Sequence, residues 1–174
     1  MKIESVQVGM LGTNCYILGK NDKVLVVDPG DEADKIKRVI GKRKVVGIIV
    51  THYHFDHIGA LNEIKQWSGA NIYDYISLEE GVCKIDDFEF ETIYTPGHKE
   101  DLISIYFKDE QALFCGDFIF ENSIGRFDLE GSNFRDMKKS IRKILTYPME
   151  MKIYPGHGDA TTLANEKKNL ESWL

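Results

Sequence analysis

The sequence predicts an α/β protein in which β-sheet lies inside and helices lie outside. Short β-rich runs and segments of helical periodicity alternate along the whole chain, as is typical of layered α/β folds. Residues 45–50 form a continuous apolar run rich in β-branched side chains, which indicates a strand buried on both faces. There is no internal repeat and no Pro- or Ser-rich linker. We therefore expect residues 1–174 to form a single domain.

The strands are predicted from short runs enriched in β-branched and aromatic residues. Turn sequences at residues 9–12 and 19–22, which contain glycine, asparagine or aspartate, separate the first three strands. The expected strands are residues 6–8, 15–18, 24–27, 45–50, 72–75, 88–94, 102–107, 112–115 and 152–154.

The helices are predicted from apolar residues that recur with a period near 3.6. In the first helix these residues are Ile36, Val39 and Ile40, and Gly41 ends the pattern. The expected helices are residues 32–40, 57–67, 133–145 and 162 onwards.

The amino-acid composition and net charge indicate which classes of molecule this protein is expected to bind. The chain has 22 basic and 28 acidic residues, so its net charge is −6, and 43% of its residues are apolar. This balance is typical of a globular protein and does not favour nucleic-acid binding, which usually needs a basic face. The longest apolar runs are strand-length, whereas a membrane span needs about 20 residues. We therefore expect a small-molecule substrate, with neither nucleic acid nor membrane as a partner.

The N-terminal segment and the cysteines predict a cytoplasmic location. The first residues contain no apolar stretch of the kind found in a signal peptide. Cys15, Cys83 and Cys115 are odd in number and lack CxxC spacing, which suits a reducing compartment and indicates neither a zinc finger nor a disulfide framework.

All five histidines follow apolar strands, where α/β folds place their chemistry. Three lie in the segment THYHFDH at residues 51–57, and the other two lie in Pro-Gly-His turns at residues 96–98 and 155–157. A lone histidine in such a turn is more often structural, but as the only remaining histidines these two are interpreted as ligands. The five are His52, His54, His57, His98 and His157.

The spacing within residues 51–57 predicts a metal site. In an extended segment His52, His54 and Asp56 can point to one side, while His57 lies where the next helix begins. Four ligands then leave one short loop, two for one metal ion and two for another. Imidazole and carboxylate donors without thiolate suit zinc, iron or manganese. The alternative, a polar surface loop with Asp56 as a helix cap, is disfavoured because this four-residue spacing rarely arises without a metal.

An aspartate at the end of another apolar strand joins this set. Asp117 follows the strand at residues 112–115, and by itself it is as readily a turn or cap residue as a ligand. Together with the histidines, it is interpreted as a carboxylate that bridges two ions.

These residues resemble the metallo-β-lactamase superfamily, and in particular its glyoxalase II-like branch. The HxHxDH loop of that family matches residues 52–57, and its later ligands match His98, Asp117 and His157. The resemblance extends through residues 12–18, 27–30, 116–117, 123–128 and 154–162. It implies a four-layer αββα sandwich with the site at the loop edge of the sheets. It also implies two divalent ions, zinc before iron or manganese: one held by His52, His54 and His98, the other by Asp56, His57 and His157, with Asp117 bridging them.

The expected activity is hydrolysis of acyl thioesters. With all five histidines used as ligands, no free general base remains, so the nucleophile is expected to be a metal-bound hydroxide oriented by Asp56. No obvious general acid remains either, which favours a leaving group that departs as an anion, such as a thiolate. Arg126 is a candidate for contact with a substrate carboxylate, and a salt bridge to Asp128 is its alternative role.

Three other functions stay open at this point. One, which the resemblance also implies, is a persulfide dioxygenase with a single iron held by His52, His98 and Asp117. Another is a lactonase, and the third is a non-enzymatic structural or storage metal site. The resemblance does not include the C-terminal helical extension with which full-length glyoxalase II helps to hold glutathione, so glutathione recognition is less strongly implied than hydrolysis.

Overall fold

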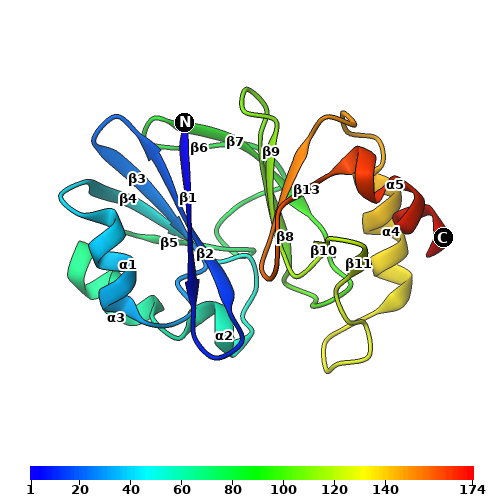
Figure 1. Cartoon of the computed structure of the whole chain (residues 1–174), viewed down its shortest axis with the longest axis horizontal. Coiled ribbons are helices and arrows are strands. Elements are labelled where there is room, and N and C mark those ends of the chain that lie inside the picture. Colours follow the sequence, from blue (N-terminus) through cyan, green and yellow to red (C-terminus); the bar gives the residue numbers. More distant parts are fainter.

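The protein is a four-layer sandwich of helices, sheet, sheet and helices (Figure 1). A computed structural model describes all 174 residues. The two sheets face each other, and each is covered by helices on its outer side: α1 and α3 on one, α4 and α5 on the other. The αββα architecture expected from the sequence is therefore confirmed.

The first sheet has five strands in the order β1-β2-β3-β4-β5. The first three pair antiparallel, and β3, β4 and β5 run parallel to one another. The strands are β1 (Lys2–Val8), β2 (Thr13–Lys20), β3 (Lys23–Val27), β4 (Lys44–Ile49) and β5 (Ile72–Tyr73).

The second sheet has six strands in the order β13-β12-β9-β8-β7-β6. Only β12 and β9 are parallel neighbours, so their carboxyl ends lie at the same edge of the sheet. A separate hairpin of β10 (Ile119–Phe120) and β11 (Ser123–Ile124) follows β9. The sheet strands are β6 (Gly81–Ile85), β7 (Phe88–Tyr94), β8 (Ile103–Phe107), β9 (Ala112–Gly116), β12 (Lys152–Pro155) and β13 (Thr161–Thr162).

The helices are short and mostly amphipathic. None of them combines the length and the apolar character that a membrane crossing requires. In α4 the side chain of Asn133 accepts hydrogen bonds from the first-turn amides of Arg135 and Asp136, which fixes where this helix begins. The helices are α1 (Ala33–Ile40), α2 (Phe55–Ile58), α3 (Leu61–Ser68), α4 (Phe134–Ile144) and α5 (Leu163–Ser172).

Three apolar layers hold the sandwich together, because the central strands are buried on both faces. In β2, Cys15 and Ile17 face the layer shared with α1 and α3, whereas Tyr16 and Leu18 face the layer between the sheets. Phe114 of β9 enters that same middle layer from the opposite sheet. The outer layer of the second sheet is filled by apolar residues of α4 and α5.

The structure differs from the sequence prediction at the helix expected over residues 57–67, which is two helices. Helix α2 begins at Phe55, and the chain turns at Gly59 before α3 begins at Leu61. At this turn the amide of Ala60 donates to the carbonyl of Pro29, and a Cβ on Gly59 would overlap the carbonyl oxygen of Gly30. The contact with the loop after β3 therefore interrupts the helix, which local periodicity cannot reveal. Strands β6, β10, β11 and β13 were also not predicted.

Candidate metal centre

The seven residues predicted as ligands lie together at one edge of the sandwich, although they come from four separate loops. His52, His54, Asp56 and His57 follow β4, His98 follows β7, and single ligands follow the parallel strands β9 and β12. These loops meet with α2 and the β1–β2 turn along the lower edge in Figure 1. The two single ligands are Asp117 and His157.

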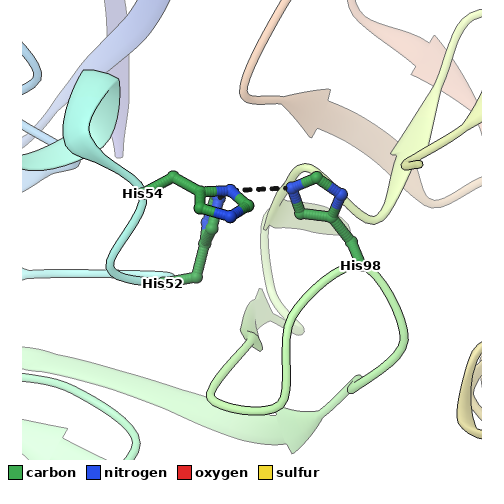
Figure 2. Close-up of side chains that lie close together, drawn as sticks. All are labelled: His52, His54 and His98. Carbon is green, nitrogen blue, oxygen red and sulfur yellow. Dashed lines mark hydrogen bonds between the residues drawn. The ribbon is translucent and has the colours of Figure 1, made fainter. Parts of the chain in front are cut away.

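The first cluster contains three imidazoles that converge from the two halves of the sandwich (Figure 2). The ligand atoms of His52, His54 and His98 lie within 4.8 Å of one another. The Nδ1 atom of His54 is 3.1 Å from Nε2 of His52 and 3.0 Å from Nε2 of His98. Three nitrogens that face one another at these distances can donate their lone pairs to one cation.

The second cluster contains Asp56, His57 and His157, whose ligand atoms also lie within 4.8 Å of one another. The Oδ2 atom of Asp56 is 3.0 Å from Nε2 of His157 and 3.4 Å from Nε2 of His57. An extended segment would place Asp56 on the side of His52 and His54. Asp56 lies instead in α2, whose helical backbone turns it towards His57, so it joins the two residues with which the family resemblance grouped it.

The carboxylate of Asp117 lies between the two clusters. Its Oδ1 is 3.3 Å from Nε2 of His57, and its Oδ2 is 3.6 Å from Nε2 of both His98 and His157. Gly116 makes this position possible, since its φ of +50° is left-handed and a Cβ there would overlap the hydroxyl of Thr51.

Four of the histidines are anchored through the ring nitrogen that faces away from the clusters. Each of these Nδ1 atoms has a hydrogen-bond partner in the surrounding structure, which orients the ring and leaves Nε2 facing the centre. The partners are Thr51 Oγ1 for His52 (3.1 Å), Asp28 Oδ2 for His57 (2.9 Å), the Arg126 carbonyl for His98 (2.8 Å) and the Leu11 carbonyl for His157 (3.1 Å).

Sequence reasoning assigned no role to Asp28, which is buried beside His57. Its carboxylate also accepts hydrogen bonds from the amide and the hydroxyl of Thr51, at 2.7 and 2.6 Å. Only 2% of its surface is exposed. The only feature of the sequence that could have indicated a role for Asp28 is its position directly after the buried strand β3. An aspartate at such a position is equally common as an ordinary turn residue.

Thr13 at the start of β2 was also not predicted as part of the site. Its hydroxyl donates to Oδ2 of Asp56 at 2.9 Å, and its backbone forms an isolated β-bridge with His157. Thr13 thus connects the first sheet to the loop after β12. What distinguishes Thr13 is that it is a fully buried polar residue at the end of a strand. The sequence alone could not indicate this, because burial is visible only in the folded chain.

The two clusters differ in their electrostatics. Burial lowers the pKa of His52 and His54, and neighbouring histidines lower it further, so these imidazoles stay neutral with free lone pairs. Burial also disfavours charge on His57, but the carboxylates of Asp28 and Asp117 outweigh it and raise its pKa to about 10. The carboxylates of Asp28 and Asp117 therefore favour positive charge at His57, which a bound metal ion can supply in place of a proton.

Two buried polar atoms at the centre support its fit to metal ions. Nε2 of His57 and Oδ1 of Asp117 are both buried and make no hydrogen bond. Buried polar atoms without partners are rare in folded proteins, and ion binding is one of the few reasons for them. The donors are imidazole nitrogens and carboxylate oxygens only, a set that suits zinc, iron or manganese.

A cavity of about 580 Å³ opens over both clusters. Arg126 lies in its wall, but its guanidinium makes a two-point ion pair with Asp128, at 2.9 and 3.0 Å. The salt bridge considered in the sequence analysis is thus present, and contact of Arg126 with a substrate stays a prediction. The cavity is lined by Leu11, His54, Phe55, Asp56, His98, Asp117, Phe120, Arg126, Leu129, His157 and Gly158.

Known proteins resemble this chain over nearly its full length. A probable metallo-hydrolase of Bacillus subtilis, YqgX, is 32% identical over 96% of this chain and 95% of its own. A Haemophilus influenzae protein named hydroxyacylglutathione hydrolase GloC is 27% identical over 97% of this chain and 96% of its own.

Solved structures have the same fold. The BLEG-1 B3 metallo-beta-lactamase superposes with a TM-score of 0.92 at 28% identity, covering 96% of this chain and 97% of that one. The structure of TTHA1623 in a di-iron-bound form superposes with a TM-score of 0.88 at 27% identity, covering 95% of this chain and 98% of that one. Residues 8–80 and 73–157 of the sequence match the family model described as metallo-beta-lactamase superfamily. The chain therefore belongs to the metallo-beta-lactamase superfamily.

Proposed function

We propose that this protein is a metal-dependent hydrolase of acyl thioesters. The observation that carries the proposal is the pair of ligand clusters joined by one carboxylate beneath an open cavity. A structural metal site is usually closed around four ligands, whereas this arrangement faces a space that can admit a substrate.

The proposed ligand sets follow the geometry of the clusters. We propose Asp117 as the bridge because its two oxygens face histidines of different clusters. His52, His54 and His98 would hold one divalent ion, and Asp56, His57 and His157 would hold the other.

When bound, such ions supply Lewis acidity that ionises water near neutral pH and polarises a carbonyl group. Asp56 is suited to orient the attacking water. Hydrogen bonds with His157 and Thr13 outweigh the effect of burial and hold the pKa of Asp56 well below its usual range, so it stays a hydrogen-bond acceptor. Thr13 also restricts the carboxylate to one orientation. His57 and His157 are held in place by Asp28 and the Leu11 carbonyl and are not free to act as general bases.

The composition of the cavity favours a thioester over an amide. Its lining contains no lysine, tyrosine, cysteine or glutamate that could protonate a leaving group. An amine leaves poorly without a proton, whereas a thiolate, with a pKa near 8.5, departs as an anion. The relative named hydroxyacylglutathione hydrolase supports the same reaction class, and the di-iron-bound neighbour supports a two-ion site.

Metal quantification followed by a thioester panel tests the proposal. Protein purified without added metal should contain about two divalent ions per chain, and it should release thiol from acyl thioesters. Asp56→Asn should lower kcat/KM by at least about 100-fold, as expected for loss of a group that orients the nucleophile. Asp109→Asn, at an exposed position in the turn between β8 and β9, is the matched control and should have no effect.

Two results would contradict the proposal. About one iron per chain, with oxygen uptake in the presence of a persulfide, would assign the site to a dioxygenase. Unchanged thiol release by Asp56→Asn with its metal retained would show that this cluster does not carry out hydrolysis.

A further inference from the structure

We propose that the cavity over the metal centre selects thioesters that carry an uncharged hydrocarbon or aromatic group, rather than the hydroxyacyl and charged thiol portions of a glutathione thioester. This inference rests on the proposed function and specifies its substrate class. It follows from the apolar wall of the cavity, from the absence of a free cation in it, and from the rigid attachment of the wall to the ligand loops.

The wall is formed by apolar side chains from four separate segments. Leu11 comes from the β1–β2 turn, Phe55 from the first position of α2, Phe120 from β10, and Leu129 from the loop after β11. Leu11 and Phe55 are 57% and 76% exposed, although Leu11 is bonded to His157 and Phe55 lies within the ligand segment at residues 51–57. Single exposed apolar residues are ordinary, but an apolar group around a cavity marks a binding site.

A second, smaller cavity extends the apolar surface beyond the metal centre. It has a volume of about 240 Å³ and shares Leu11, Phe55 and Asp56 with the first cavity. Met10, whose side chain is fully exposed, lies in its wall. A hydrocarbon group that starts at the metal centre can therefore continue across the β1–β2 turn.

The charges of the cavity do not favour an anionic substrate portion. Arg126 is the only lysine or arginine in the lining, and both of its bonded nitrogens face the carboxylate of Asp128. A substrate carboxylate would have to share the guanidinium of Arg126 with Asp128, and the remaining charged side chains of the lining are the predicted ligands. Glutathione, which carries two carboxylates, would have no free cationic partner here.

The apolar wall is held in position by the same contacts that hold the site. The carbonyl of Leu11 accepts from Nδ1 of His157, so the β1–β2 turn is bonded directly to a predicted ligand. Glu166, which is 1% exposed, accepts from the amide of Asn122 and thereby holds the hairpin that carries Phe120. A wall that is already ordered loses little entropy when it binds a ligand.

Two homologous series of thioesters test the inference and show which side of the substrate enters the cavity. In one series the acyl group lengthens from acetyl to hexanoyl on the uncharged thiol N-acetylcysteamine. In the other the acyl group stays acetyl while an uncharged alkyl thiol lengthens. We expect kcat/KM to rise by about threefold to fourfold per methylene in one series. S-lactoylglutathione should fall at least tenfold below the best uncharged ester, a discrimination of the size that a few methylenes give in an apolar pocket.

Leu11→Ser removes part of the wall without changing the backbone bond to His157, and it should reduce the gain per methylene. Ile76→Ser is the matched control, because Ile76 is 90% exposed and lines neither cavity. A measurement independent of turnover is calorimetric binding of a non-hydrolysable hexyl thioether to the metal-loaded protein. It should show a negative heat-capacity change that weakens in Leu11→Ser but not in Ile76→Ser.

The outcomes separate this inference from the proposed function. Thiol release with no dependence on chain length, or a preference for S-lactoylglutathione, would overturn the inference and leave the hydrolase proposal standing. Binding of the hexyl thioether that weakens in Leu11→Ser, without thiol release from any ester, would support the apolar site and overturn the hydrolase proposal.

Discussion

Replacing Gly156 with alanine tests whether the close contact between loops builds the metal centre. A Cβ at this position would overlap Oδ1 of Asp117 and lie 2.6 Å from Cε1 of His57, where ordinary contact begins at 3.4 Å. The loop cannot move away easily, because the Gly156 amide donates to Gly116 at 2.8 Å and its carbonyl accepts from Asn14 at 2.7 Å. The two side chains therefore have to move instead.

The size of the effect follows from this displacement. A shift of about 1 Å in the groups that position a reaction costs about 100-fold in rate. Disturbing the contacts around metal ligands costs about 10- to 100-fold in metal affinity. The metal-free variant should also lose about 1–3 kcal/mol of unfolding free energy from overpacking. Competition with a chromophoric chelator measures the affinity, and urea unfolding of the metal-free protein measures the stability.

Gly69→Ala is the control for replacing a glycine. Gly69 follows α3 with a φ of +70°, and a Cβ there would meet nothing within 4 Å. It should cost about 1 kcal/mol through its left-handed backbone and leave metal affinity unchanged. If Gly156→Ala binds metal within threefold of the wild-type affinity, the steric reasoning is refuted.

Three further outcomes are expected. Removing divalent ions with a chelator should abolish thiol release and lower the Tm in scanning calorimetry, because a ligand bound only by the folded state stabilises it. Asp28→Asn should weaken metal affinity by about 10- to 100-fold in chelator competition, because the oriented contact with His57 is altered. Burial raises the pKa of Glu4, but hydrogen bonds from Lys2 and Arg43 outweigh it and lower the pKa. Ionised Glu4 therefore stabilises the fold above the usual glutamate pKa, and this contribution is lost as the pH falls through its folded pKa. Glu4→Gln should be about 0.5 kcal/mol less stable than wild type at neutral pH and no less stable in acid, as urea unfolding at both pH values will show.

Much of the fold was predictable because its signals are local. The runs at β2, β3 and β4 are short, apolar and bounded by turns, and their continuous apolar character matches strands that are buried on both faces. Residues 52–57 could be interpreted as a ligand loop because four donors of the right type lie within six positions. Asp117 was different, since a single aspartate after a strand carries no chemical signal of its own.

By itself, then, the sequence determined the alternation of strands and helices, the family and the candidate ligands. The tertiary structure decided how these donors are oriented and which groups anchor them. The division of α2 from α3 depends on a contact with the loop after β3, and the helical turn of α2 turns Asp56 towards His57. Asp28 contacts His57 across 29 positions of the chain, and the cavity wall gathers Leu11, Phe55 and Phe120 from separate loops. Such contacts arise because the loops at one edge of two packed sheets meet in space, and local spacing along the chain contains no information about that meeting.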